Sequence, residues 1–169
     1  TSLQLHLRVA PEDFAAHWNA AQAIAGVQVA LSANSPYWNG FDTGYASHRA
    51  QLFQQLPTAG IPYSFQNWSD FELCVSDLLA TGVIDDISES RLDVRPVPKY
   101  GTVEMRFCDS PTSVRDLSAI AALTQCLAEE ASRIVDSGRK VEQMRPWLIR
   151  ENKWRAARYG LEAIIIRDN

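Results

Sequence analysis

Hydrophobic and polar residues alternate along three stretches of the chain, residues 3–9, 91–96 and 102–107. Such alternation predicts β-strands, because successive side chains of a strand point to opposite faces of the sheet. The second and third stretches are separated by a short turn, which favours a tight antiparallel pair. Each predicted strand has one apolar face and one polar face.

The polar faces are rich in ionisable side chains rather than in the threonine, lysine and serine typical of a wetted strand. By alternation they carry Gln4, His6, Arg8, Asp93, Arg95, Thr102, Glu104, Arg106 and Cys108. The apolar faces carry Leu3, Leu5, Leu7, Val9, Leu92, Val94, Val103, Met105 and Phe107.

Helical periodicity occupies most of the remaining chain. Residues 11–32 and 47–56 are predicted helices, separated by a loop rich in asparagine, proline, glycine and aromatic residues. Ser69 and Glu72 form a capping-box pattern for a third helix. Asp109 or Ser110 is predicted to cap a fourth.

A last helix is predicted from Pro146 to the residue before Gly160. The pattern as a whole predicts an α+β fold, with an antiparallel sheet and helices packed on its apolar face. A chain of 169 residues normally forms one domain. Because Thr1 and the run Ile164–Ile166 both look like strand residues, we expect residues 1–169 to be a central to C-terminal fragment of a larger domain.

Composition limits the cellular location and the partners that we expect for the protein. No apolar run is long enough for a membrane helix, and we see no secretory leader. Cys74, Cys108 and Cys126 are widely spaced and odd in number, which argues against disulfides and fits a reducing cytoplasm. The net charge of −4 makes nucleic acid an unfavourable partner. We therefore expect a cytoplasmic protein with no nucleic-acid or membrane partner.

Basic residues concentrate between Arg139 and Arg158. A solvated helix face and an anion-facing element are both compatible with this pattern.

The polar faces of the predicted strands also allow more than one interpretation. Glu104 and Arg106 fit either a cross-strand ion pair or a phosphate site, since arginine can grip phosphate with two nitrogens. His6 fits a hydrogen bonder or a metal ligand.

Three motifs resemble one known family. "LSANSPYWNGFDTGYASHRAQLFQQLPTAGIPYSF", "DVRPVPKYGTVEMRFCD" and "ENKWRAARYGLEA" are similar to those of the bacterial carboxylate–amine ligases, the type 2 glutamate–cysteine ligases. This resemblance implies a glutamine synthetase-like fold, in which an antiparallel sheet curves into a funnel with helices outside. It also implies chemistry that depends on ATP and Mg²⁺: the γ-carboxylate of glutamate is phosphorylated, and cysteine or another small amine displaces the phosphate.

The resemblance also implies roles for particular residues. Arg106 would contact the transferring phosphate and Arg95 the nucleotide phosphates. The metal ligands would be Glu104, His6 and Gln4. Glutamate or the amine would be bound by Arg49, Asn34, Trp38 and Arg8, and the nucleotide side would be lined by Arg95, Lys153 and Arg155.

One strand departs from the family pattern. Members have a strand like His-Val-His-Val-Gly where this chain has "QLHLRV", so that Gln4 replaces a histidine and Arg8 replaces a glycine. This keeps a second interpretation open, a divergent homologue that binds glutamate or nucleotide without efficient turnover. A third is a purely structural part of a larger fold. The partners expected are the small-molecule substrates, the remainder of the same chain and a second copy in a homo-oligomer, and the piece alone is expected to be inactive.

Overall fold

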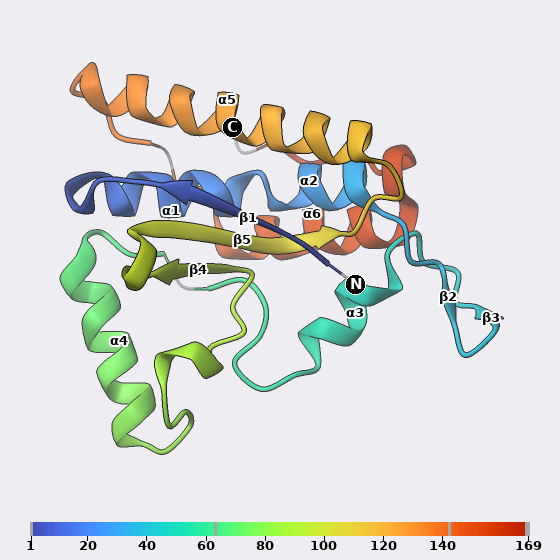
Figure 1. The fold of residues 1–169 in the computed structure, drawn as a ribbon, viewed down its shortest axis with the longest axis horizontal. Helices are drawn as coiled ribbons and strands as arrows, with labels where there is room; N and C mark the ends of the chain where they lie inside the picture. Colours follow the sequence, from blue (N-terminus) through green and yellow to red (C-terminus); the bar gives the residue numbers. More distant parts are fainter. Residues whose placement is uncertain (1, 63, 142, 168–169) are drawn as a thin grey trace.

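The central sheet of the computed structural model has three antiparallel strands, in the order β1–β5–β4 (Figure 1). These are β1 (Ser2–Arg8), β5 (Thr102–Asp109) and β4 (Val94–Val97). The three predicted strands and the tight antiparallel pair form, but the second strand begins at Val94, so residues 91–93 of the predicted stretch 91–96, Asp93 included, lie outside it. The structure describes residues 2–62, 64–141 and 143–167, so the prediction made for Thr1 lies outside the described residues.

A bulge in β5 changes the predicted faces at one end of the sheet. Leu5 pairs with Met105, but Leu3 pairs with Cys108, so β5 takes three residue steps where β1 takes two. The extra residue moves Cys108 onto the face of Leu3. The prediction that Cys108 lies on the polar face is therefore wrong, and its sulfur lies 4.0 Å from the carbonyl oxygen of Gln28 in the helical layer.

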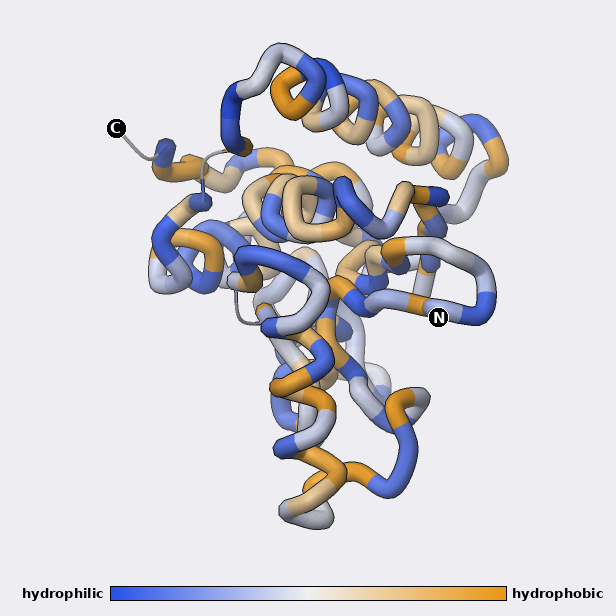
Figure 2. Tube along the Cα trace, turned by 90° about the vertical axis from the view of Figure 1, so that its left-hand side faces the viewer, coloured by the Kyte–Doolittle hydropathy of each residue, from blue (hydrophilic) through white to orange (hydrophobic). Residues whose placement is uncertain are grey.

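The helices pack on the apolar face of the sheet. The predicted helix 11–32 forms as a 3₁₀ turn (Pro11–Asp13), α1 (Phe14–Ala23) and α2 (Ala25–Ser32). Both α1 and α2 contact β5, α5 (Val114–Asp136) packs against this helix pair, and α6 (Pro146–Tyr159) packs against α2 (Figure 1). In Figure 2, hydrophilic and hydrophobic positions are interleaved along α5, the uppermost helix, as in a helix with one buried side.

An aromatic cluster joins α4 (Trp68–Ala80) to α1. Its ring centroids lie 4.9–5.9 Å apart, at tilted or edge-to-face angles. Away from this contact α4 projects from the body of the molecule in both views (Figures 1 and 2). The rings belong to Phe14, Trp18, Phe65, Trp68 and Phe71.

Two predicted helix caps are wrong, although the helices themselves form. Asn67, not Ser69, begins α4, and its side-chain oxygen accepts from the backbone N–H of Asp70 at 3.0 Å. Ser113, not Asp109 or Ser110, begins α5. In both cases a competent capping side chain stands only a few residues away from the predicted one, so composition alone does not select it.

The loop after α2 contains a small hairpin that alternation does not reveal. It pairs β2 (Tyr37–Trp38) with β3 (Phe41–Asp42) around Asn39 and Gly40. Both turn residues have positive φ, 49° and 84°, which asparagine and glycine tolerate best. The elements that remain are α3 (His48–Gln54) and the 3₁₀ turns Ile87–Glu89, Pro98–Tyr100 and Gly160–Glu162.

The strand expected at Ile164–Ile166 does not form; these residues have no regular structure. Instead, the backbone N–H and carbonyl of Ile166 both bond to the side chain of Asn152 on α6, each at 2.8 Å. The fold is a mixed α+β arrangement with small antiparallel sheets, as predicted at that level. Among the described helices, none combines the length and the apolar character needed to cross a membrane.

Candidate functional site

The polar face of the sheet is organised around Glu104. The register places His6, Glu104 and Arg95 on a single rung across all three strands. Glu104 is only 1% exposed, and its Oε2 accepts from Nε of Arg95 at 2.9 Å, with the Arg95 Nη2 at 2.8 Å. Both nitrogens contact the same carboxylate oxygen, so charge-assisted hydrogen bonds from Arg95 hold one side of the Glu104 carboxylate.

The other carboxylate oxygen of Glu104 is held more loosely. Nε of Arg106 lies 3.5 Å from Oε1, and Nε2 of His6 lies 3.9 Å from it. His6 is oriented by Thr102, whose hydroxyl lies 3.0 Å from its Nδ1. The structure thus brings together four of the predicted site residues, one from β1, one from β4 and two from β5.

Positive charge exceeds negative charge in this group. Burial lowers the pKa of Arg106, repulsion from Arg95 lowers it further, and attraction to Glu104 opposes both. Within the described part of the chain, Nε of Arg106 is buried and has no hydrogen-bond partner. A buried N–H on a charged group favours an anionic acceptor strongly. The site can therefore stabilise an anion such as a phosphoryl group.

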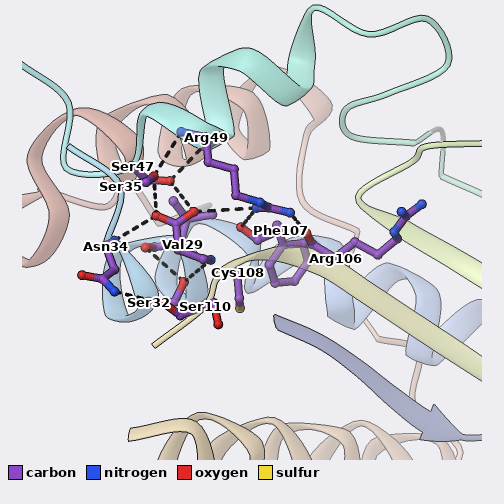
Figure 3. A network of polar contacts seen from close by, with 12 residues as sticks. Val29, Ser32, Asn34, Ser35, Ser47, Arg49, Arg106, Phe107, Cys108 and Ser110 are labelled. Carbon is purple, nitrogen blue, oxygen red and sulfur yellow. Dashed lines mark hydrogen bonds and ion pairs between the residues drawn. The ribbon is translucent and has the colours of Figure 1, made fainter. Parts of the chain in front are cut away.

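Arg49 occupies a different position from the one expected for a substrate ligand. Its Nη2 donates to the carbonyl of Arg106 at 2.9 Å and its Nη1 to the carbonyl of Phe107 at 3.4 Å (Figure 3). Nη1 also lies 3.7 Å from Oδ1 of Asp109. Burial lowers the pKa of Arg49, and attraction to Asp109 opposes this shift. Its guanidinium is committed to the protein itself.

Asp109 is a buried polar residue whose role sequence reasoning missed. It is 2% exposed and accepts from the backbone N–H of Asn34 at 2.9 Å and from the hydroxyls of Ser35 and Ser47 at 2.7 and 3.0 Å (Figure 3). The signal available was an acidic residue at the end of a strand, beside a serine-rich loop motif. From the sequence, this residue is predicted to cap a helix, which the structure contradicts.

The two residues expected at the substrate end are separate from the Glu104 group in the contacts described for them. The Asn34 side chain donates to the carbonyl of Ser110 at 3.1 Å. Trp38 is 52% exposed on the hairpin, with its ring 5.9 Å from that of His48. Gln4 and Arg8 are exposed on β1, at alternate positions either side of His6.

The basic helix uses several of its charges inside the protein. Lys153 is 1% exposed and forms a buried ion pair with Asp93, so it does not offer its ammonium group to a nucleotide. Arg155 bonds Glu151 at 2.7 Å and the carbonyl of Ile164 at 3.2 Å. The buried ion pair of Lys153 argues against the nucleotide contact expected for it. Arg155 bonds residues close to it in the sequence.

The described histidine, cysteine and acidic side chains provide few of the ligands that a metal site needs. Within residues 2–62, 64–141 and 143–167, no three histidine, cysteine or acidic side chains lie close enough to hold a metal ion together. Oε1 of Glu104, with only long contacts, is the oxygen best placed to serve as one ligand. Mg²⁺ often binds one or two carboxylates and completes its coordination shell with water and substrate phosphates. One carboxylate oxygen is therefore compatible with a Mg²⁺ site whose other ligands are water and phosphate.

Comparison with known proteins identifies a family that matches the whole chain and relatives that match most of it. The family described as Glutamate-cysteine ligase family 2 (GCS2) matches residues 1–169. A proposed glutamate–cysteine ligase of an Arthrobacter species is 61% identical over 139 residues, which is 82% of this chain and 36% of that protein. Similar proposed ligases occur in Paenarthrobacter aurescens, at 59% identity over 82% of this chain and 36% of the relative, and in Mycolicibacterium smegmatis, at 57% over 83% and 37%. The chain spans a little over a third of the length of these relatives.

Proposed function

The chain belongs to glutamate–cysteine ligase family 2, and we propose that the protein carrying it joins the γ-carboxylate of glutamate to cysteine or another small amine at the expense of ATP. The carboxylate would take the terminal phosphoryl group of ATP and release ADP. The amine would then form the amide bond, releasing inorganic phosphate and a proton.

The observation that carries this proposal is the cluster of guanidinium groups around one buried carboxylate. Arg95 and Arg106 both contact Glu104, which supplies one negative charge against their two positive charges. Phosphoryl transfer depends on fixed positive charge that meets the developing negative charge on the transferring group. A buried, incompletely bonded Arg106 is suited to that task.

The two arginines would have separate roles. Arg95 is locked to Glu104 by two nitrogens and to the carbonyls of Ser88 and Ser90 at 2.9 and 3.2 Å, so it holds the carboxylate in place. Arg106 has a weaker contact with Glu104 and a 3.4 Å bond from its Nη1 to the carbonyl of Ser90, and 15% of its side chain is exposed, so its guanidinium charge is only partly committed and can meet a phosphate oxygen.

Magnesium would act beside this cluster and supply further charge neutralisation on the phosphates. Oε1 of Glu104 would provide one ligand. His6 and Gln4, on the same strand face, remain candidates from the family resemblance, although Mg²⁺ prefers oxygen and Gln4 has the better donor atom. We also propose that the complete protein has a glutamine synthetase-like fold, in which the antiparallel sheet curves into a funnel.

The direct test is ADP release by the complete protein. We expect release that requires both glutamate and an amine, measured with a panel containing cysteine, other amino acids and simple amines. A matched reaction with Glu129→Gln, an exposed glutamate on α5, should behave like the unaltered protein. No release with any amine, from a protein shown to be folded, would contradict the proposal.

The alternative function, binding without efficient turnover, is favoured by Arg8. This arginine is exposed on the strand face that carries His6, and it adds a positive charge where the family pattern has a glycine. Calorimetric binding of glutamate or of ATP with Mg²⁺, in the absence of any ADP release, would select this alternative.

A further inference from the structure

We propose that Arg49 and Asp109 form a positioning pair that fixes the β5 bulge and thereby holds Arg106 in place. The proposal rests on the function proposed above, in which Arg106 meets the transferring phosphoryl group. Neither residue is given a contact with substrate. Both would act on the reaction through the backbone that carries Arg106.

The bulge creates the need for such a pair. Between Met105 and Cys108, β5 has one residue more than β1 can match, so backbone groups there lose their regular ladder partners. The carbonyls of Arg106 and Phe107 lie in this interval, and both accept from the guanidinium of Arg49. The planar fork of arginine suits two adjacent acceptors, and lysine has no equivalent. Arg49 therefore supplies the donors for two carbonyls of the bulged segment.

The backbone N–H of Arg106 is also fixed. It donates to the carbonyl of Asp93 at 2.8 Å, just before β4 begins. Because both its N–H and its carbonyl are bonded, the peptide units around Arg106 have little freedom. The direction in which its side chain leaves the strand is determined by these bonds.

Asp109 holds Arg49 at both ends. Its Oδ1 lies 3.7 Å from the Arg49 guanidinium, and its Oδ2 accepts from the hydroxyl of Ser35, whose oxygen in turn accepts from the backbone N–H of Arg49 at 3.1 Å. Ser47 donates to Oδ1 and begins α3, the helix that carries Arg49 (Figure 3). A single buried carboxylate thus places both the backbone and the charged end of Arg49.

Phe53 gives a second link between the two arginines. The guanidinium carbons of Arg49 and Arg106 lie 5.4 and 5.7 Å from the centre of its ring. Cation–π contacts of this kind are individually weak but directional. A shift of Arg49 would therefore be felt by Arg106 through the ring as well as through the backbone.

The main test is Arg49→Lys in the complete protein. We expect kcat to fall about a hundredfold, because a displacement of about 1 Å at a reacting group has an effect of that size, while KM for the amine stays unchanged. The matched control is Arg133→Lys, an exposed arginine on α5 paired with Glu129 and Glu130, which should retain full activity.

A double-variant cycle separates positioning from direct contact. If Arg49 acts through Arg106, Arg49→Lys should add little further loss in an Arg106→Lys background. A full hundredfold loss in that background would mean that Arg49 acts independently, and would overturn the proposal. So would an Arg49→Lys variant with unchanged kcat.

A spectroscopic measurement decides the matter without activity. The ¹H–¹⁵N resonance of the Arg106 Nε–H, assigned by its loss in Arg106→Lys, should shift in Arg49→Lys and stay in place in Arg133→Lys. Asp109→Asn should give the same shift, because an asparagine amide has one acceptor oxygen and cannot accept from all the donors that now bond the Asp109 carboxylate. If Asp109→Asn does not fold, the result for Arg49→Lys decides. An unshifted resonance would overturn the positioning role, whereas absence of ADP release by the unaltered protein would contradict only the proposed function.

Discussion

Glu104 shows at the residue scale why burial matters to the proposed chemistry. A carboxylate that is 1% exposed between two arginines is stable only because its partners compensate for lost hydration. The same arginines become available to a second anion only if Glu104 does not neutralise them fully. One carboxylate among several guanidinium groups meets both conditions.

Glu104→Gln is predicted to abolish Mg²⁺-dependent turnover in the complete protein. Loss of the carboxylate removes a metal ligand and several kcal/mol of transition-state stabilisation, which corresponds to a loss of about a thousandfold or more in rate. The sequence alone suggests that the fold stays intact. The structure adds that Arg95 and Arg106 lose their counter-charge, so we also expect a lower free energy of unfolding, by up to about 3 kcal/mol.

ADP release and urea unfolding, measured on the same preparation, separate these two effects. ADP release must be measured under conditions in which the Glu104→Gln variant is folded. Near-normal turnover by folded Glu104→Gln would exclude Glu104 as a metal ligand.

Arg106→Lys is predicted to be nearly as severe although it preserves the charge. Lysine presents a point charge and cannot bond the carbonyl of Ser90 with one nitrogen while it presents another nitrogen to a phosphate oxygen. We expect a loss of kcat of at least about a hundredfold, as for the removal of one donor to a developing anion. A mild effect like that of Arg133→Lys would instead identify Arg106 as an ordinary ion-pair partner of Glu104.

Cys108 and Cys126 are predicted to differ sharply in reactivity. Burial raises the pKa of the Cys108 thiol from 9.0 to about 11, whereas Cys126 is exposed. At neutral pH a thiol reagent should label Cys126 quickly and Cys108 only on unfolding, because the thiolate is the reactive form. Mass spectrometry of timed labelling checks this, and equal rates would contradict the buried position.

The same thiol makes stability depend on pH. Because the folded state binds the proton more tightly than the unfolded state, stability should be full below pH 9 and fall as the pH rises towards 11. A Cys108→Ala variant should lose this part of the pH dependence.

At the scale of elements, alternation and helical periodicity were enough to predict the three strands and most helices. They were not enough to place Cys108, because a bulge is a property of two strands compared with each other and not of one strand's pattern. The hairpin around Asn39 and Gly40 is different. Its asparagine–glycine turn is a recognised signal, but strands of two residues are too short to alternate.

The cap of α4 offers a test at this scale. Asn67→Ala is predicted to lower the free energy of unfolding by about 1 kcal/mol, since it removes the acceptor for the N–H of Asp70. Ser69→Ala lies inside the helix and should be nearly neutral. Urea denaturation of the two variants measures both values. The reverse order would restore the cap expected from the sequence.

At the scale of the whole molecule, the convergence of His6, Arg95, Glu104 and Arg106 was predictable in outline. Polar residues on one face of adjoining antiparallel strands must come together once the strands pair. The ion pair between Lys153 and Asp93, and the fork of Arg49 on the β5 bulge, join residues about sixty positions apart. Neither follows from a local pattern, because both depend on how helices dock on the sheet.

Residues 1–169 alone are predicted to have no ligase activity. The described part of this chain places one carboxylate within the arginine cluster, whereas a site that binds Mg²⁺ and several phosphates normally uses more. The matched relatives extend well beyond the aligned region, which is about 36% of the Arthrobacter protein. The test compares ADP release by the isolated piece, shown by circular dichroism to be folded, with release by the full-length Arthrobacter relative under the same conditions. Turnover of ATP by the piece that requires glutamate and an amine would mean that these residues already hold a sufficient metal and phosphate site.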